Sequence, residues 1–363
     1  MSNLFEPIQV GSIATKNRVY MAPLTRNRAH PDGRINESAA TYYSQRASAG
    51  LILTEATQIN AEGKGYINTP GIYNDDHVEA WKKIVDAVHE KDGKILLQLW
   101  HVGRIAHTSL QPNEAQPLAP SAIQAKSQTF IETGPVDVSE PRAMTAEDIE
   151  RTISDYKIAA ELAKKAGFDG VEVHAANGYL IDQFLQDKTN HRDGEYGGSI
   201  ENRMRFLTRV LDEVIDVWGS DKVGVRLSPT GTFNDMGDSD PEKTFGAVIE
   251  KLNDYNLAYL HMVEKFPGIE TDSEEQKLLH RLREKWQGFY ISNGDYGAEN
   301  SQKVIDSGYA DAVTFGRIFI ANPDLPERLR TGAPLNEADP TTFYGGDEKG
   351  YTDYPFLEEK QAA

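Results

Sequence analysis

The chain has 363 residues, of which 39% are hydrophobic and 26% charged, with no cysteine and a formal net charge of −18. This composition is typical of a globular protein, and the missing cysteines exclude disulfides, thiolate metal sites and a cysteine nucleophile. So acidic a surface repels nucleic acid and anionic membranes, so we expect neither as a partner. The first residues lack the pattern of a signal peptide, and no stretch reaches the roughly 20 apolar residues of a membrane span, so we expect a cytoplasmic protein.

Short apolar runs alternate with longer segments of helical periodicity along the chain. Because these runs are apolar on both faces, they predict parallel strands covered by helices. Eight such units favour an α/β fold, a closed (β/α)8 TIM barrel forming one domain over residues 1–363, with an N-terminal strand cap. The predicted barrel strands are 18–24, 51–56, 95–100, 170–174, 223–227, 258–263, 289–293 and 312–315.

One helix is readable in detail from its ends. Thr145 and Asp148 have the spacing of a capping box, an apolar stripe runs from Ile149 to Ala163, and Gly167 supplies a stop. A second stripe, from Trp81 to Val88, predicts another helix.

Two segments break this rhythm. Residues 102–143 follow the third predicted strand, contain five prolines and show no helical pattern, so we expect a lid or loop insertion there. The C-terminal tail, residues 334–363, is rich in glycine, aspartate and aromatic residues. Its aromatics either pack back over the barrel or decorate the surface.

The predicted active site lies at the C-terminal ends of the barrel strands. These ends lack the clustered histidines and carboxylates of a metal site and the lysine of a Schiff-base enzyme. Their neutral hydrogen-bonding groups, with one arginine within a predicted strand, suit an organic cofactor. We expect no bound metal. In chain order they are Thr25, Ala56, Gln98 with Trp100, His174, Arg226, Asn293 with Gly294, and Gly316 with Arg317.

The last two strand ends predict a phosphate site. Gly294 and Gly316 would let backbone N–H groups approach a phosphate, and Arg317 can add a charged hydrogen bond. Loops after the seventh and eighth strands are the usual phosphate site of a barrel. Each glycine taken alone also fits an ordinary turn.

His174, Asn177 and Tyr179 are the most informative group. At a strand end, His174 and Asn177 can both donate to one substrate oxygen, and a nearby tyrosine hydroxyl can supply a proton. The alternative is a histidine and an asparagine that only satisfy backbone groups at a turn, but three such groups at a barrel strand end favour chemistry.

Six motifs carry a resemblance that spans nearly the whole chain. They are Asn-Arg-Val at 17–19, Ala-Pro-Leu-Thr-Arg at 22–26, Gln-Leu-Trp-His-Val-Gly-Arg at 98–104, His-Ala-Ala-Asn-Gly-Tyr-Leu at 174–180, Tyr-Gly-Gly-Ser-Ile-Glu-Asn-Arg at 196–203 and Phe-Tyr-Gly-Gly at 343–346. With these motifs the sequence resembles the Old Yellow Enzyme family of flavin-dependent ene-reductases, in the bacterial branch of nitrate-ester and morphinone reductases. No catalytic position departs from the family pattern.

The resemblance implies tightly bound FMN across the barrel mouth. Thr25 would contact the C4 oxygen of the ring, and Arg226 would lie beside N1 and the C2 oxygen, where its charge stabilises reduced flavin. The implied cofactor-binding set is Pro23, Leu24, Thr25, Ala56, Gln98, His174, Arg226, Asn293, Gly294, Gly316 and Arg317.

The resemblance also implies a two-step reaction. NADPH or NADH reduces the flavin and leaves, and an α,β-unsaturated carbonyl or nitro compound then receives hydride from N5. His174 and Asn177 bind the substrate oxygen, and Tyr179 protonates the α-carbon. Nitrate esters and nitroaromatics are further substrates that the resemblance suggests. Tyr66, Trp100 and Tyr344 resemble the family's pocket-lining aromatics, although each also fits core packing.

Two rival interpretations compete with this one. A non-catalytic flavin-binding protein would need the flavin contacts but not His174, Asn177 and Tyr179. A related flavin-dependent barrel with an added iron–sulfur cluster is excluded by the lack of cysteine. We expect a monomer or a homodimer that acts on small molecules.

Overall fold

Eight parallel strands close into a barrel, as the sequence predicts. The computed structural model describes residues 3–264, 268 and 270–357, so the last six residues of the expected tail lie outside it. The ladder passes through every strand in chain order and closes where the last strand pairs with the first. The barrel strands are β3 (Val19–Met21), β4 (Leu51–Leu53), β6 (Ile95–Trp100), β11 (Gly170–His174), β12 (Val223–Leu227), β13 (Tyr259–Val263), β14 (Tyr290–Asn293) and β15 (Ala312–Phe315), with the short β5 (Thr57–Gln58) beside β6.

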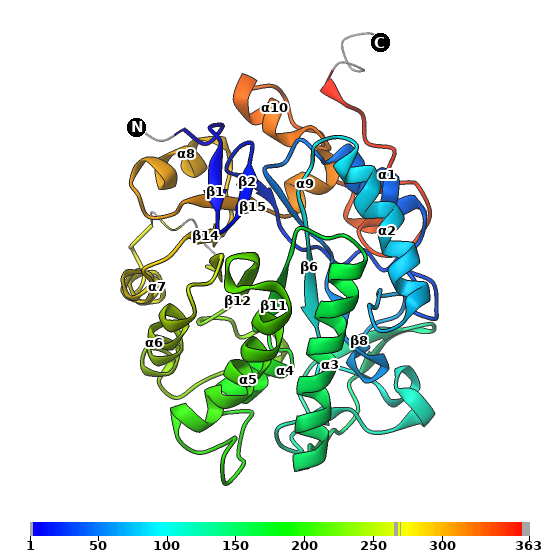
Figure 1. The fold of residues 1–363 in the computed structure, drawn as a ribbon, viewed down its shortest axis with the longest axis vertical. Coiled ribbons are helices and arrows are strands. Elements are labelled where there is room, and N and C mark those ends of the chain that lie inside the picture. The colour runs from blue at the N-terminus through cyan, green and yellow to red at the C-terminus, as the bar shows by residue number, and fades with distance from the viewer. Residues whose placement is uncertain (1–2, 265–267, 269, 358–363) are drawn as a thin grey trace.

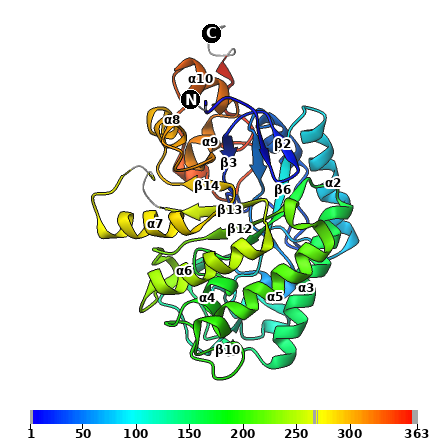
Figure 2. The same ribbon diagram turned by 60° about the vertical axis from the view of Figure 1, so that its left-hand side comes forward.

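Helices follow the strands and surround them (Figure 1, Figure 2). This confirms the (β/α)8 architecture. The helices are α1 (Ser38–Gln45), α2 (Asp75–His89), α3 (Ala146–Lys165), α4 (Leu180–Leu185), α5 (Ile200–Trp218), α6 (Pro241–Leu252), α7 (Glu274–Lys285), α8 (Ala298–Asp306), α9 (Arg317–Ala321) and α10 (Leu325–Thr331).

Helix α3 begins and ends as predicted. The Asp148 backbone N–H donates to the Thr145 hydroxyl over 3.1 Å, and the Thr145 N–H donates to the Asp148 carboxylate over 2.8 Å. The helix ends before Gly167, whose φ of +92° suits glycine. Its stripe from Ile149 to Ala163 is buried against the barrel.

The first two strands are shorter than predicted. We expected a strand over 18–24, but β3 ends at Met21. The Ala22 N–H still donates to Phe315, but Pro23 has no N–H with which to continue the ladder. We expected a second strand over 51–56, and β4 ends at Leu53. In both cases the remaining residues lead into the barrel mouth.

The barrel floor is closed by the predicted N-terminal cap, a hairpin of β1 (Ile8–Val10) and β2 (Ile13–Thr15). Val10 and Ile13 are buried in one cluster with inward-facing barrel residues, which include Tyr20, Leu51, Leu96, Tyr259 and Ile291. The floor is therefore apolar, and the hairpin separates it from solvent.

The insertion at 102–143 carries no α-helix, as expected. It contains two short 3₁₀ turns, Thr108–Leu110 and Pro112–Glu114, and a hairpin of β8 (Gln128–Ile131) and β9 (Gly134–Asp137). Two further short strands, β7 (Leu118–Ala119) and β10 (Arg142–Ala143), pair in parallel. The Ile67 N–H donates to the Phe130 carbonyl over 2.9 Å, which brings the hairpin against the loop that holds Tyr66.

The described part of the tail packs back on the barrel, and of its aromatics Tyr351 is buried whereas Tyr344 stays exposed, so each of the two interpretations above holds for part of the tail. The Arg26 guanidinium donates to the Gly350 carbonyl over 2.7 Å, and Arg28 donates to Thr342 over 3.0 Å. Both guanidinium groups also lie over the ring of Tyr351. The tail is thus attached directly after the first barrel strand.

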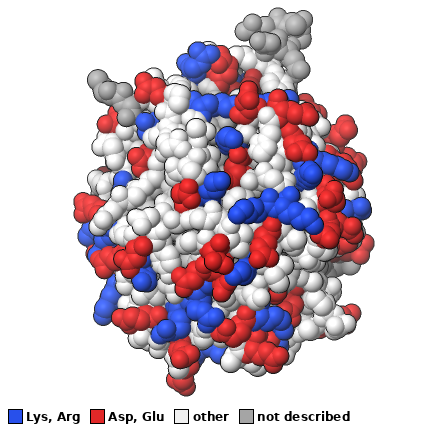
Figure 3. Space-filling view, viewed as in Figure 1, with Lys and Arg blue, Asp and Glu red and all other residues white. Residues whose placement is uncertain are grey.

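The acidic composition does not produce a surface of one sign. On the face shown in Figure 3, acidic and basic side chains are interspersed. Within the described residues, no helix has the length and apolar character needed to cross a membrane.

The hairpin cap gives a stability test. Gly11 has a φ of +55°, and a Cβ there would lie 2.0 Å from the Asp221 carbonyl oxygen. Gly11→Ala should lower the free energy of unfolding by about 2–4 kcal/mol, from left-handed strain plus the steric clash. Thermal unfolding measures this. Gly308→Ala is the control, because Gly308 has a φ of +74° but open space around it. Equal destabilisation of both variants would contradict the close-approach argument.

Candidate active site

A cavity of about 520 Å³ opens at the C-terminal ends of the barrel strands. This size suits a cofactor or small-molecule ligand. Eight of the sequence-predicted residues line it: Pro23, Leu24, Asn177, Arg226, Asn293, Gly294, Gly316 and Arg317.

Arg226 is the buried cation among the residues that line this cavity. Its side chain faces inward from β12 and donates to the Asn293 side-chain oxygen over 2.7 Å. Burial lowers the pKa of Arg226, and the nearby Glu172 carboxylate opposes that shift. An arginine retains its proton even so. The cavity therefore contains a fixed positive charge.

A strained turn follows β11 and carries Asn177 into the cavity. Asn177 has a φ of +59° and Gly178 a φ of +78°, two successive left-handed residues. The Asn177 N–H donates to the Ser228 hydroxyl over 2.7 Å, and the Gly178 N–H donates to the Asp182 carboxylate over 2.8 Å. The Asn234 side chain donates to the Asn177 carbonyl over 2.9 Å. These three hydrogen bonds together hold the backbone of the turn in its left-handed conformation.

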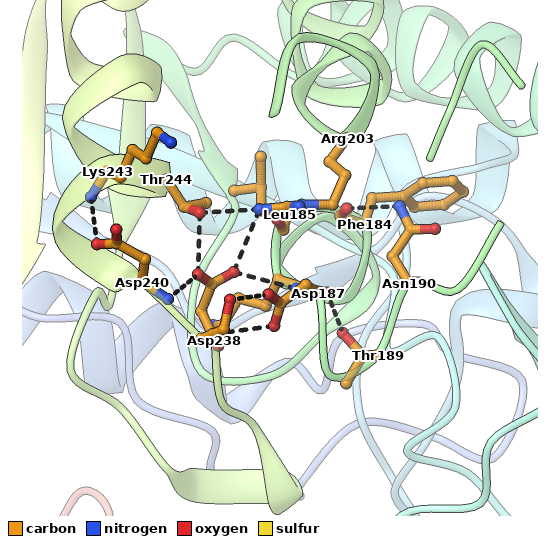
Figure 4. A network of polar contacts seen from close by, with 12 residues as sticks. Phe184, Leu185, Asp187, Thr189, Asn190, Arg203, Asp238, Asp240, Lys243 and Thr244 are labelled. Atoms are coloured by element: carbon orange, nitrogen blue, oxygen red, sulfur yellow. Dashed lines mark hydrogen bonds and ion pairs between the residues drawn. The ribbon is translucent and has the colours of Figure 1, made fainter. Parts of the chain in front are cut away.

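The segment that contains Ser228 and Asn234 is itself fixed from two directions. Figure 4 shows the first: Asp238 accepts from the Asp187 N–H over 3.0 Å and forms an ion pair with Arg203 at 3.4 Å, and both side chains are nearly buried. In the second, the Arg104 guanidinium donates to the Asn234 carbonyl over 3.2 Å. The segments after β11 and β12 thus form one unit.

An aromatic wall lies beside the turn that carries Asn177, although its members are not among the residues that line the cavity itself. The Tyr179 ring meets His174 edge-on with 5.2 Å between centroids, and meets Trp100 edge-on at 5.0 Å. Tyr66 stacks on Trp100, and its hydroxyl lies 3.2 Å from the Tyr179 hydroxyl. Ala56 is buried in the same cluster. Trp100 is only 1% exposed, so it belongs to the hydrophobic core as well as to the aromatic wall.

Burial fixes the protonation of the two central groups. It lowers the pKa of His174 to about 3, with a further contribution from the Arg226 charge, so the imidazole is neutral at neutral pH. Burial, followed by the neighbouring Tyr66, raises the pKa of Tyr179 well above its ordinary value. The site therefore combines a neutral histidine with a tyrosine that retains its proton.

The remaining predicted residues lie around these two parts. Gln98 faces inward from β6 and donates to Glu172 over 2.7 Å, below the mouth. Thr25 is half-buried just beyond Leu24. Tyr344 is 67% exposed. The N–H of the adjacent Gly345 donates to the Arg26 carbonyl, so Tyr344 lies near the end of the first strand. Arg317 is also exposed, with its guanidinium 3.9 Å from Asp295.

Sequence reasoning missed the loop after β12. Residues 230–233 line the cavity, and Asn234 holds the Asn177 turn. A signal was present: Ser228-Pro229-Thr230-Gly231 is a turn-rich stretch directly after a barrel strand end, where active-site loops begin. Asp182 was missed as well, and no sequence signal distinguishes it from a surface aspartate.

The donor set fits a polar organic cofactor. Three buried polar atoms around the mouth have no hydrogen-bond partner within the described residues: His174 Nδ1, Arg226 Nε and Trp100 Nε1. Orphaned buried donors are costly, and a polar ligand relieves that cost. In the part of the chain that the structure describes, no group of three or more His, Asp or Glu side chains is arranged to hold a metal ion.

Comparison with known proteins agrees with this geometry. Residues 3–336 match the model of the NADH:flavin oxidoreductase / NADH oxidase family. Morphinone reductase, solved in complex with tetrahydroNAD, is 48% identical with a TM-score of 0.93, and 98% of each chain is covered. The old yellow enzyme homologue from Zymomonas mobilis is 46% identical with a TM-score of 0.93, covering 98% of this chain and all of that one.

The chain belongs to the Old Yellow Enzyme family. Among curated relatives, 12-oxophytodienoate reductase 1 of Oryza sativa subsp. japonica is 46% identical over 98% of this chain and 93% of its own length. The corresponding reductase 2 of Arabidopsis thaliana is 42% identical, over 98% and 96%. The protein is therefore an NAD(P)H-dependent flavin oxidoreductase that uses FMN, and the non-catalytic alternative is discarded.

The strained turn gives a test that is independent of the cofactor contacts. A Cβ on Gly178 would lie 2.7 Å from both the Asn234 Cβ and the Met236 Cγ. Gly178→Ala should therefore displace the Asn177 turn and lower kcat/KM for the oxidising substrate about 10- to 100-fold, because small misplacements of this kind are costly. Steady-state kinetics on protein with full flavin content measures it.

Gly198→Ala is the matched control, since Gly198 has a φ of +77° with nothing nearby. Unchanged kinetics in Gly178→Ala would show that the turn does not need its observed backbone.

Proposed function

We propose that this enzyme reduces the activated C=C bond of α,β-unsaturated carbonyl or nitro compounds, with NADH or NADPH as the reductant. The carrying observation is that the neutral His174 contacts the protonated Tyr179, with 5.2 Å between their ring centroids, beside the turn that carries Asn177 into the cavity. Such substrates need donors for an oxygen and an acid for a carbon. The curated and solved relatives named as oxophytodienoate and morphinone reductases support this substrate class.

FMN is proposed to occupy the cavity. Pro23 and Leu24 would contact the ring, with Thr25, Ala56 and Gln98 as further contacts, and Arg226 would supply positive charge. Asn293, Gly294, Gly316 and Arg317 would hold the phosphate, because they offer backbone N–H groups and a guanidinium at the usual position. Bound there, FMN would supply the acceptor for hydride from the nicotinamide and the donor of hydride to the substrate.

His174 and Asn177 bind the substrate oxygen in this proposal. Negative charge develops on that oxygen as hydride arrives at the β-carbon, and donors already in place stabilise it without reorganisation. The low pKa of His174 keeps its imidazole neutral, so it acts as a hydrogen-bond donor and not as a second cation beside Arg226. The clamped turn fixes where Asn177 can reach.

Tyr179 is the proposed acid. Its raised pKa means that it holds its proton until a strongly basic carbon is present. The edge-on contacts with His174 and Trp100 fix the ring, and Tyr66 is the hydrogen-bond partner of its hydroxyl. Tyr66, Trp100 and Tyr344 would form the walls of the substrate site.

Nitro compounds fit the same donors, because a nitro oxygen accepts hydrogen bonds and takes up negative charge as a carbonyl oxygen does. Nitroalkenes are therefore included in the proposed substrate class. Among the residues that the structure describes, no contact favours nitrate esters or nitroaromatics over enones.

The two half-reactions separate the role of Tyr179 from that of the flavin site. Only alkene reduction consumes a proton from an acid, so Tyr179→Phe should slow flavin reoxidation by an enone about 100-fold or more. Flavin reduction by NADPH should change only a few-fold. Anaerobic stopped-flow spectroscopy of each step measures both rates.

Tyr66→Phe is the matched control, since it removes the other hydroxyl of the 3.2 Å pair and leaves the acid in place. It should slow reoxidation much less. Equal losses in both half-reactions of Tyr179→Phe would refute the assignment of Tyr179 as the proton donor.

A further inference from the structure

A buried chain of polar side chains crosses the barrel interior just below the proposed flavin site. Glu172 is fully buried on β11, two residues before His174, and points into the barrel. Its carboxylate accepts from the Gln98 amide over 2.7 Å and lies 2.8 Å from His261 Nδ1. The other ring nitrogen of His261 lies 2.9 Å from the Thr314 hydroxyl. The chain thus joins four strands.

The hydrogen bonds indicate that Glu172 is ionised. Both of its partners offer N–H groups, and only a carboxylate accepts at both oxygens without a proton of its own. Burial lowers the pKa of His261, so its ring is neutral, donates from Nδ1 and accepts from Thr314. Burial opposes ionisation, but the hydrogen bonds from His261 and Gln98 and the charge of Arg226 hold the pKa of Glu172 below its usual value. The Glu172–His261 pair therefore carries one negative charge.

A carboxylate is an expensive way to fill this layer. The cluster of the barrel floor consists of side chains such as Leu96, Leu53 and Ile291, which cost nothing in buried charge, together with the uncharged Tyr259, which interacts with Glu172. Burying a charge is costly even when it is paired, and apolar replacements are often neutral or stabilising. A filling role alone does not explain Glu172.

Two consequences of the position of Glu172 explain why a carboxylate stands there. Because Glu172 accepts from the Gln98 amide nitrogen, that nitrogen is held toward the carboxylate, which fixes the direction of the amide oxygen as well. Because Glu172 attracts Arg226, it offsets the single buried cation of the cavity. A negative charge near a redox group disfavours reduction, and a positive charge favours it.

We propose that Glu172 is a positioning residue and counter-charge that orients Gln98, offsets Arg226 and thereby lowers the reduction potential of bound FMN. This rests on the proposed function, which assigns Gln98 and Arg226 to the flavin. A lower potential makes the reduced cofactor a stronger hydride donor to the alkene.

The test is the reduction potential of purified, FMN-loaded Glu172→Gln, measured anaerobically against a reference dye. The substitution removes the charge at nearly constant shape. The ratio of reduced to oxidised FMN at a fixed potential should rise at least tenfold, which is about 30 mV for a two-electron couple. Titration of the apoprotein should give the same factor as tighter binding of reduced relative to oxidised FMN. An unchanged ratio would overturn the proposal.

Two controls separate charge from disturbance. Glu172→Asp keeps the charge and should stay near the wild-type potential; a shift as large as that of Glu172→Gln would overturn the counter-charge. Glu264→Gln makes the same change in another fully buried carboxyl, which accepts from the hydroxyls of Tyr290 and Tyr309. It should leave the ratio within about twofold of wild type, and an equal rise there would also overturn the proposal.

Arg226→Met distinguishes failure of this inference from failure of the proposed function. It should lower the reduced-to-oxidised ratio, and an unchanged ratio would mean that Arg226 does not act on FMN at all. The double variant Glu172→Gln/Arg226→Met removes both charges, so it buries no unpaired charge if the single variant folds poorly. Its ratio should return toward wild type, and a ratio no higher than that of Arg226→Met would overturn the proposal.

Discussion

The site depends on one geometrical constraint, the alternation of side chains along the strands of a closed barrel. On β11, Val171 and Val173 face the helices, so Glu172 and His174 must face the interior. On β12 the same rule sends Arg226 inward. Because each strand exposes its inward residues at successive heights, the interior is layered. An apolar floor lies below a polar belt, and the proposed catalytic groups lie above both.

The family motifs that lie far from the chemistry gain a physical role from this arrangement. Arg104 and Arg203 belong to two of the motifs that carry the resemblance, yet neither lines the cavity. Both guanidinium groups instead hold the segment after β12, through Asn234 and Asp238. That segment in turn holds the left-handed turn at Asn177. Backbone strain at a functional residue persists only when its surroundings enforce it, and these arginines supply part of that enforcement.

The sequence was informative about the barrel and about residues adjacent to strand ends. Eight apolar runs were enough to place all eight strands. Because His174 ends one of those runs, its position at the barrel mouth followed from the predicted strand. Contacts set by barrel register were out of reach. Gln98 and Glu172 are 74 residues apart, and their contact follows from the pairing of β6 with β11. Asn234 is 57 residues from Asn177, and no local pattern marks it as a partner. Strand ends were overestimated where Pro23 interrupts the ladder, because apolar character continues after hydrogen bonding stops.

The proposed reacting groups and the proposed substrate walls stand on different parts of the fold, and this affects how the range of substrates can change. The groups proposed for hydride and proton transfer stand on barrel strands or on the clamped turn, where buried contacts fix them. The walls proposed for the substrate site come from elsewhere: Tyr66 from a loop braced by the β8–β9 hairpin, and Tyr344 from a tail held by Arg26. Phe130 and Tyr344 are more than half exposed, so replacing them disturbs no core. Substrate range can therefore vary through these segments while the charge balance around Arg226 stays constant, because the two properties depend on different layers of the fold.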